Sequence, residues 1–222
     1  SSLNKIISLD QGVNRKIWAG TVNSGLNLLD PFTGKFIRIL QNASNEHAIN
    51  GNTIRDLLVD KKGDLYVGTS NGICILSKAD QDTEGDFKFQ NLYAASPAEN
   101  LQVNVEDIFE DTRGRIWVGT LNAGLFLLKN GKLHQANLKK DISVLSVIQD
   151  GNNLLCLGTS EGIVKYSPDE GEAKTCNEND GIPANAFSRG SKLFSESGRI
   201  YFGGASGVTT FIPEELGTIN NV

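Results

Sequence analysis

Four polar side chains recur at one position of otherwise apolar strands. When these strands are aligned on the turn glycines that follow them, the shared position is occupied by Asp56, Asp107, Ser146 and Ser191. Packing between apolar sheets does not by itself call for a polar group there. The position therefore predicts side chains that line a water-filled channel, where they bind either water or a ligand.

Charged and amide side chains stand beside this polar position. Arg55, Glu106 and Arg189 lie at the starts of the same strands, and Asn185 lies in the loop before the last of them. Guanidinium, carboxylate and amide groups hydrogen-bond to neutral polar molecules, so these four residues form the predicted ligand-binding set. Since hydrogen bonds and stacking would hold such a ligand, we expect its affinity to change little with salt.

Residues that could carry catalysis or bind a metal do not converge in the sequence. His47 lies in a loop, His134 lies in a predicted outer strand, and neither has a nucleophile motif or metal-ligand spacing beside it. Asp60 and Asp111 recur just before turns, where an aspartate hydrogen-bonds its own backbone. We therefore predict no catalytic residue, no metal and no cofactor.

The three cysteines also give no indication of a site. Cys74 and Cys156 fall in predicted strands, Cys176 lies in the polar stretch 172–180, and no C-x-x-C spacing occurs. An odd number of cysteines allows no complete pairing, and a strand cysteine commonly serves as a small buried apolar residue. A zinc or redox site is therefore disfavoured.

The strands that must position these residues repeat along the chain. Five short apolar segments end in a Gly-Thr or Gly-Gly step: IWAGT (17–21), LYVGT (65–69), IWVGT (116–120), LCLGT (155–159) and IYFGG (200–204). Repeats of roughly 40 to 50 residues with only strand and turn signals predict radially arranged blades. The predicted fold is all-β, a β-propeller of four-stranded antiparallel blades with five repeats present.

The recurring glycines and aromatic residues are predicted to be architectural. Glycine weakens a strand, so its recurrence at one position indicates that a neighbouring segment approaches closely there. Trp18, Tyr66, Trp117 and Tyr201 share a mid-strand position, where packing between blades explains them better than stacking on a sugar. Because the fourth repeat lacks both the aromatic residue and the usual turn glycine, we expect it to be irregular.

Composition excludes several classes of partner. The 222 residues are 39% hydrophobic and 21% charged, with a net charge of −5 and no stripe of Lys and Arg, so a nucleic-acid partner is disfavoured. No apolar run approaches the roughly 18 residues of a membrane span, and the first residues lack a signal-peptide pattern. We expect no membrane insertion of this segment.

Three long connections precede predicted inner strands, at 41–53, 94–104 and 177–188. Long loops on one face of a rigid scaffold commonly carry binding function. Their Asn- and Ser-rich composition suits hydrogen bonding to neutral polar partners, although loop asparagines also satisfy their own backbone.

Residues 54–73 (IRDLLVDKKGDLYVGTSNGI) and 105–125 (VEDIFEDTRGRIWVGTLNAGL) resemble the two-component regulator propeller repeat. Residues 179–216 resemble the last blade of the periplasmic sensors of Bacteroides-type hybrid two-component systems. The resemblance implies two seven-bladed propellers followed by an immunoglobulin-like domain, a membrane span, and kinase and regulator modules. It further implies a periplasmic location, a response to polysaccharide-derived oligosaccharides and a propeller without catalytic residues.

The repeats divide the chain into blades at approximately 1–41, 42–93, 94–138, 139–178 and 179–216, with 217–222 starting a linker to a following domain. No fourth strand is visible in the last repeat, and no closing strand precedes the first. We expect the C-terminal blades of a larger, seven-bladed propeller, whose exposed sheet edges favour a homodimer. A closed five-bladed ring is the alternative.

Two classes of function fit such a chain. One is a non-catalytic sensor segment of a hybrid two-component histidine kinase, which provides a scaffold and a ligand or dimer surface. The other is a propeller enzyme, such as a lyase or glycan-active hydrolase, and this needs a convergent set of His, Glu and Asp. The missing set favours the sensor, and a pure protein-interaction propeller stays open.

Overall fold

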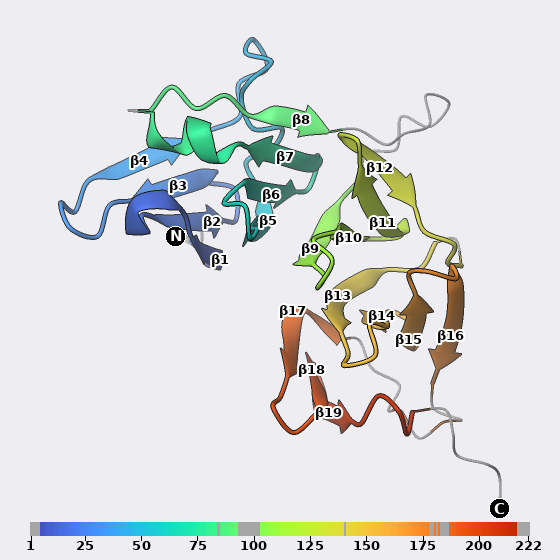
Figure 1. The fold of residues 1–222 in the computed structure, drawn as a ribbon. Helices are drawn as coiled ribbons and strands as arrows, with labels where there is room; N and C mark the ends of the chain where they lie inside the picture. The colour runs from blue at the N-terminus through green and yellow to red at the C-terminus, as the bar shows by residue number, and fades with distance from the viewer. Residues whose placement is uncertain are drawn as a thin grey trace, which may run out of the picture. The chain divides into compact units, whose positions relative to one another are not determined.

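A computed structural model describes residues 5–83, 85–92, 103–139, 141–177, 180, 182 and 187–216. These residues form antiparallel sheets joined by turns and two short 3₁₀ helices, η2 (Val13–Arg15) and η3 (Lys78–Asp82) (Figure 1). The predicted fold class, all-β with propeller blades, is confirmed. The linker expected at 217–222 and parts of the loops 94–104 and 177–188 lie outside the described residues.

The chain divides into two compact units, residues 1–108 with 128–134 and residues 109–127 with 135–222. The first unit contains two sheets whose strands follow in chain order. The strands of the first sheet are β1 (Ile6–Gln11), β2 (Ile17–Thr21), β3 (Leu26–Leu29) and β4 (Phe36–Ile39). Those of the second are β5 (Ile54–Val59), β6 (Leu65–Thr69), β7 (Gly72–Leu76) and β8 (Gln90–Leu92).

The remaining strands repeat the same succession. The third sheet contains β9 (Val105–Glu110), β10 (Ile116–Thr120), β11 (Gly124–Lys129) and β12 (Lys132–Gln135). In the second unit, β13 (Val144–Gln149), β14 (Leu155–Thr159), β15 (Gly162–Ser167) and β16 (Glu172–Cys176) form the fourth sheet. The last sheet has three strands among the described residues, β17 (Phe187–Phe194), β18 (Ile200–Gly204) and β19 (Gly207–Phe211).

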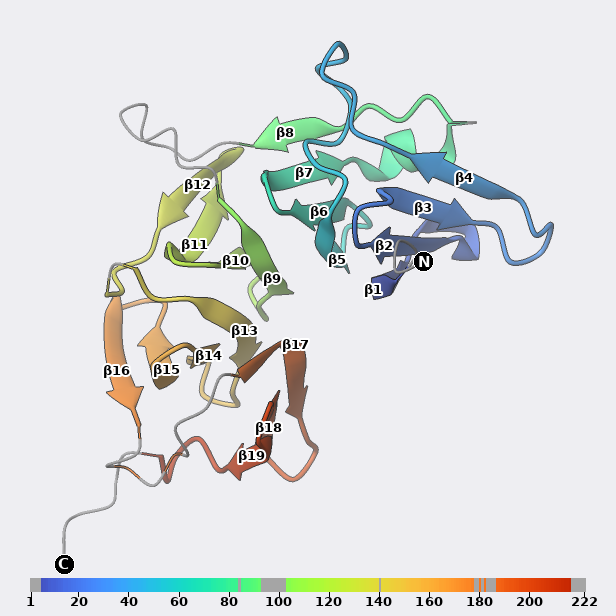
Figure 2. The same ribbon diagram turned by 180° about the vertical axis from the view of Figure 1, so that it is seen from behind.

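First strands of consecutive sheets lie side by side. Strand β1 runs beside β5 in the first unit, and β13 runs beside β17 in the second (Figures 1 and 2). This neighbourhood explains the strand glycines. A Cβ atom on Gly20 would lie 2.6 Å from Ile54 Cγ2, and one on Gly68 would lie 2.5 Å from Val105 Cγ1, both on the next first strand. The close approach predicted from the repeat is therefore present, and a side chain there would collide with it.

The fourth sheet is regular, so the irregularity expected from its sequence is wrong. In the third sheet, Asp111 accepts backbone hydrogen bonds from Arg113 and Arg115, and Gly114 turns the chain at a φ of 75°. Asp150 accepts from Asn152 and Leu154 in the same way, and Asn153 adopts a φ of 64°. Asparagine tolerates this left-handed conformation better than most residues, and it therefore replaces the glycine.

Apolar clusters fill the space between consecutive sheets. Trp18 and Leu26 of the first sheet pack with Val67 and Leu76 of the second, and Trp117 packs edge-on against Tyr166 in the second unit. Trp18 and Trp117 are 1% and 2% exposed, which confirms their predicted role in packing between blades.

The three cysteines are free thiols buried in these clusters, and Cys176 is the last residue of β16 rather than a surface residue. Burial raises the pKa of both Cys74 and Cys156 to about 12. A neutral thiol is a poor nucleophile and metal ligand, so these cysteines act as small apolar residues.

Candidate functional site

The predicted ligand-binding residues are distributed over both units. Arg55 lies in β5 and Glu106 in β9, both in the first unit, whereas Arg189 lies in β17 of the second unit. Asn185 lies outside the described residues. The structure brings the strands of Arg55 and Glu106 together, because Asp56 on β5 binds the backbone of Ile108 on β9.

Arg55 occupies a backbone position whose register shift recurs in β1 and β13. The pairing of β5 with β6 shifts between Ile54 and Asp56, so Arg55 is the extra residue of a β-bulge. Bulges redirect a side chain and are frequent next to binding sites. Among the described residues, the buried Nε of Arg55 has no hydrogen-bond partner, while the Glu106 side chain is almost fully buried at 4% exposure. Arg55 is partly exposed and can donate, whereas Glu106 is a buried carboxylate that can only accept.

Polar side chains at the shared position of the first strands form hydrogen bonds to the next sheet. Ser8 Oγ donates a hydrogen bond to Asp56 Oδ1 at 3.0 Å and accepts one from the Leu57 amide. Asp56 Oδ2 in turn accepts from the amide of Ile108 at 2.8 Å. In the second unit, Ser146 Oγ donates to the carbonyl of Ser188. A polar side chain on one first strand thus satisfies backbone groups of the next, which gives this position a structural role.

Ser8 and Asp10 also form hydrogen bonds between neighbouring first strands, and the sequence analysis did not identify them. Asp10 Oδ2 accepts from the Val59 amide at 2.6 Å, again across two first strands. A signal for Ser8 was available, since it precedes Gly20 by the same interval that separates Asp56 from Gly68. Whether Asp56, Asp107, Ser146 and Ser191 also face a channel stays a prediction.

The loop 41–53 covers a hollow next to β8. The hollow is lined by Glu46, His47, Lys88, Phe89, Gln90 and Asn91. Asn91 Nδ2 donates to the carbonyls of Glu46 and Ala48, and the amide of Phe89 donates to the carbonyl of His47. These bonds fix the loop on the edge of the second sheet.

Polar side chains of this hollow are available to a ligand. The side chains of His47 and Glu46 are 54% and 88% exposed, and His47 Nε2 lies 3.7 Å from Glu46 Oε1. Three asparagines of the loop instead accept hydrogen bonds from its backbone amides, namely Asn42, Asn45 and Asn52. This is the second role that the sequence analysis gave for loop asparagines. The hollow therefore offers the imidazole of His47 and the carboxylate of Glu46 from the loop 41–53, and the ammonium group of Lys88 from the connection before β8.

A second polar cluster is structural. Asp111 is fully buried and accepts from Trp117 Nε1 at 3.0 Å and Arg115 Nε at 2.5 Å. Burial acts to raise the pKa of the Asp111 carboxyl, but the bonds from Trp117 and Arg115 outweigh it, so the pKa lies below its ordinary value. The local backbone role predicted for Asp60 and Asp111 is confirmed by their bonds to the following turns.

Catalytic and metal-binding groups do not assemble in the described part of the chain. His47 and His134 are both exposed, and they lie apart in the chain, His47 in the loop 41–53 and His134 in β12. Within the described residues, no group of three or more His, Cys, Asp or Glu side chains is placed to hold a metal ion. No described helix is long and apolar enough to cross a membrane.

Residues 48–71 and 99–122 match the family described as the two-component regulator propeller. Two segments of the chain therefore match the repeat of this family, as the sequence indicated. It is also 27% identical over 213 residues to histidine kinase P4 of Formosa agariphila, which covers 92% of the chain and 15% of that relative. The chain thus spans under a fifth of the relative's length.

Solved structures share the fold. The extracellular domain assigned to hybrid two-component system BT4673 of B. thetaiotaomicron superposes with a TM-score of 0.74 at 23% identity, over 93% of this chain and 27% of that one. A catalytically inactive H270A virginiamycin B lyase from Staphylococcus aureus superposes with a TM-score of 0.68 at 16% identity, over 95% of this chain and 71% of the lyase. At these identities the two similarities establish the propeller fold alone.

Proposed function

We propose that this chain is a non-catalytic, extracytoplasmic sensor segment of a hybrid two-component histidine kinase. The observation that carries this proposal is the match of two of its repeats to the two-component regulator propeller family. The similarity to a histidine kinase along nearly the whole chain supports it. A periplasmic location, a homodimer and a following immunoglobulin-like domain belong to the same proposal.

The sensed ligand in this proposal is an oligosaccharide derived from a polysaccharide. Sugar hydroxyls both donate and accept hydrogen bonds, and amide, carboxylate and imidazole groups such as those that line the hollow at the loop 41–53 bind them. Arg55, Glu106, Asn185 and Arg189 remain the proposed contacts at the starts of the first strands. The hollow at His47, formed in part by the loop that precedes β5, is a further proposed contact region.

A propeller enzyme is the second candidate function, because a lyase shares this fold. The virginiamycin B lyase is catalytically inactive when one of its histidines is replaced by alanine. In this chain His47 has a single carboxylate beside it, Glu46, and within the described residues no nucleophile joins the pair. We propose that this segment catalyses no reaction.

Calorimetric titration of the chain with a panel of neutral oligosaccharides tests the site. His47→Ala is expected to weaken binding about tenfold, because it removes a hydrogen-bonding group from the hollow. His134→Ala is the matched control, since His134 is also an exposed histidine, lies on β12 and does not line the hollow. Equal affinities for the two variants would contradict the assignment of the hollow, and turnover of a sugar that disappears in His47→Ala would favour the enzyme.

A further inference from the structure

We infer that residues 188–192, near the start of β17 in the last sheet, bind an oxyanion. The bound group is a sulfate, a phosphate or a carboxylate. We call residues 188–192 the β17 bulge. This site is independent of the proposed neutral oligosaccharide, because inorganic ions alone are expected to bind there.

The β17 bulge is larger than the bulges in the other first strands. In β5 and β13 the register shift leaves one residue unpaired, Arg55 and Leu145 respectively. Within the described residues of the last sheet, the pairing passes from Phe187 directly to Lys192, so residues 188–191 have no paired residue in β18. Extra residues bend a strand and leave its backbone groups outside the ladder, and β17 is bent in Figure 2. The bulge therefore offers backbone amides that a regular strand would use for pairing.

Gly190 determines the backbone conformation of the bulge. Its φ of 62° lies in the left-handed region, and a Cβ atom there would meet no described atom within 4 Å. The left-handed backbone therefore explains this glycine, whereas close approach of the next strand explains Gly20 and Gly68. A left-handed residue in a short irregular segment turns successive amides to one side, which is the arrangement of an anion-binding nest.

The side chains of the bulge carry positive charge and hydroxyl groups. Arg189 and Lys192 provide a guanidinium and an ammonium group, and Ser188 and Ser191 provide hydroxyls. Strands β13 and β18 both lie beside β17, and neither strand contains a charged residue. The sequence 181–195 also lacks Asp and Glu. The local charge therefore favours an anion, and these donors suit its oxygen atoms.

Two contacts hold the bulge in place within the second unit. Ser146 Oγ on β13 donates a hydrogen bond to the carbonyl of Ser188 at 3.2 Å. The ammonium group of Lys192 lies 5.3 Å from the centre of the Phe109 ring. Both partners belong to the same unit as β17. Because the backbone and one cation are already positioned, an anion that binds here orders few further groups.

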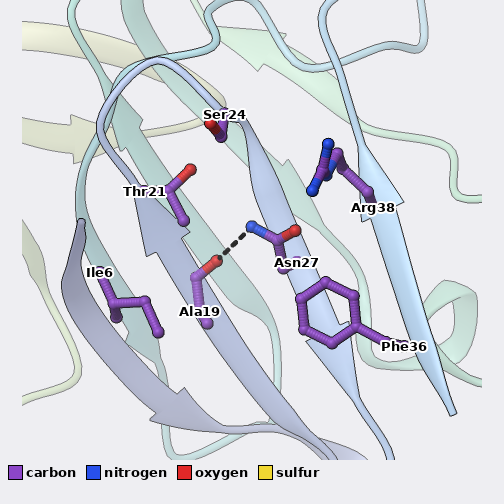
Figure 3. Close-up of a pocket in the computed structure, with 7 residues that line it drawn as sticks. All are labelled: Ile6, Ala19, Thr21, Ser24, Asn27, Phe36 and Arg38. Atoms are coloured by element: carbon purple, nitrogen blue, oxygen red, sulfur yellow. Dashed lines mark hydrogen bonds between the residues drawn. The ribbon is translucent and has the colours of Figure 1, made fainter. Parts of the chain in front are cut away.

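The first sheet offers a comparison, because it has an arginine beside a hollow. Figure 3 shows Arg38 at this hollow together with Phe36 and Asn27. The Asn27 amide donates to the carbonyl of Ala19, and β3 pairs with β4 residue by residue without a bulge. Arg38 is the one cation among the residues that line the hollow. The combination of two cations with an unpaired backbone segment therefore distinguishes the β17 bulge from this hollow.

Thermal unfolding of the chain 1–222 in sodium sulfate, phosphate or glucuronate, each compared with sodium chloride of equal ionic strength, tests the inference. Saturable binding should raise the unfolding midpoint by about 3–6 °C at roughly ten times the dissociation constant. Arg189→Gln is expected to weaken binding about tenfold or more, because it removes a charged donor. Arg199→Gln is the matched control and should bind like the unmodified chain, because it removes the same charge from the turn at the other end of the β17–β18 hairpin.

Sulfate also stabilises proteins through its exclusion from their surface, and this effect grows steadily with concentration in every variant. A steady rise of the midpoint that is equal in the three proteins would therefore overturn the inference. A saturable rise that Arg189→Gln leaves unchanged would also overturn it, because the ion would then bind elsewhere. Loss of saturable binding in Arg189→Gln alone would support it. A response to sulfate and phosphate would then assign the site to a tetrahedral oxyanion, and a response to glucuronate alone would assign it to a carboxylate.

Discussion

Aspartates that precede the tight turns act on their own backbone. Asp60, Asp111 and Asp150 each accept two amide bonds from the turn that follows, and Asp111 also binds the indole of Trp117. At Asp111 these bonds, together with that from Arg115, hold the pKa of the carboxyl below its ordinary value against the effect of burial. The recurrence of aspartate in the repeat is therefore explained by turn stability, without a metal or an acid-base role.

Replacing Asp111 by asparagine should make the protein less stable at neutral pH. Asp111 has a folded-state pKa below the ordinary value of about 3.9, so its contribution is present above that pH and is lost as pH falls through the folded pKa. We expect Asp111→Asn to lower the free energy of unfolding by about 1–3 kcal/mol at pH 7 and by much less near pH 3. Urea unfolding at both pH values measures this, and a difference that does not change with pH would contradict the assigned ionisation.

Two strand glycines at the same position provide a matched test of close approach. A Cβ atom on Gly119 would lie 2.7 Å from the carbonyl oxygen of Val144, whereas one on Gly158 would lie 3.4 Å from Phe187 Cβ. Gly119→Ala is expected to cost about 1–3 kcal/mol, and Gly119→Val more, because the neighbouring backbone must move. Gly158→Ala should change stability little, since the smaller entropy of the unfolded chain offsets the cost of the looser contact. Equal unfolding midpoints for the two alanine variants would remove this explanation of the glycines.

First strands are the elements that join one sheet to the next. Asp56 on β5 binds Ser8 on β1 and the amide of Ile108 on β9, so one carboxylate connects three strands. It lies next to the β-bulge at Arg55. A polar residue at this position is thus required even where the surrounding face is apolar.

Removing the Asp56 carboxylate should destabilise the first unit. Asp56→Ala leaves the Ile108 amide and the Ser8 hydroxyl without this acceptor, which we expect to cost about 2–3 kcal/mol in chemical denaturation. Asp86→Ala is the control, because Asp86 is an exposed residue of the connection before β8. A neutral Asp56→Ala variant that nevertheless loses oligosaccharide binding would show that Asp56 serves the ligand rather than the fold.

Local sequence signals predicted the strands well because each strand is short and bounded by turn residues. The Gly-Thr steps located β2, β6, β10 and β14 to within one residue. The regular turn at Asn153 was not predicted, because asparagine and glycine can share a left-handed backbone conformation. The hollow beneath the loop 41–53 could not be predicted either, since bonds from Asn91, on a strand over 40 residues away in sequence, create it.

At the scale of the whole molecule, the protein repeats one kind of antiparallel sheet and one kind of packing contact between consecutive sheets. Burial is concentrated between consecutive sheets, and the described helices are limited to η2 and η3. Function in such a scaffold is carried by loops and strand starts, which vary while the sheets are retained. The family match fits the structural role of the sheets, and the hollow at the loop 41–53 fits the functional role of the loops.

Spectroscopy and elemental analysis test this description of the purified chain. We expect a far-ultraviolet circular dichroism spectrum of β-structure with almost no helix, together with less than about 0.1 equivalents of zinc or calcium, because no ligand set has suitable spacing. Substantial helical ellipticity would refute the fold. Stoichiometric metal that survives dialysis against a chelator would require a site that the described residues do not contain.

Calorimetric titration of the complete sensor domain with polysaccharide-derived oligosaccharides tests the sensor proposal most directly. The proposal predicts saturable binding to one neutral oligosaccharide class, little change in affinity between low and high salt, and weaker binding in the His47→Ala and Arg55→Ala variants. A flat titration for every oligosaccharide, while the intact kinase still responds to the same polysaccharide in cells, would place the ligand site outside this propeller and contradict the assignment.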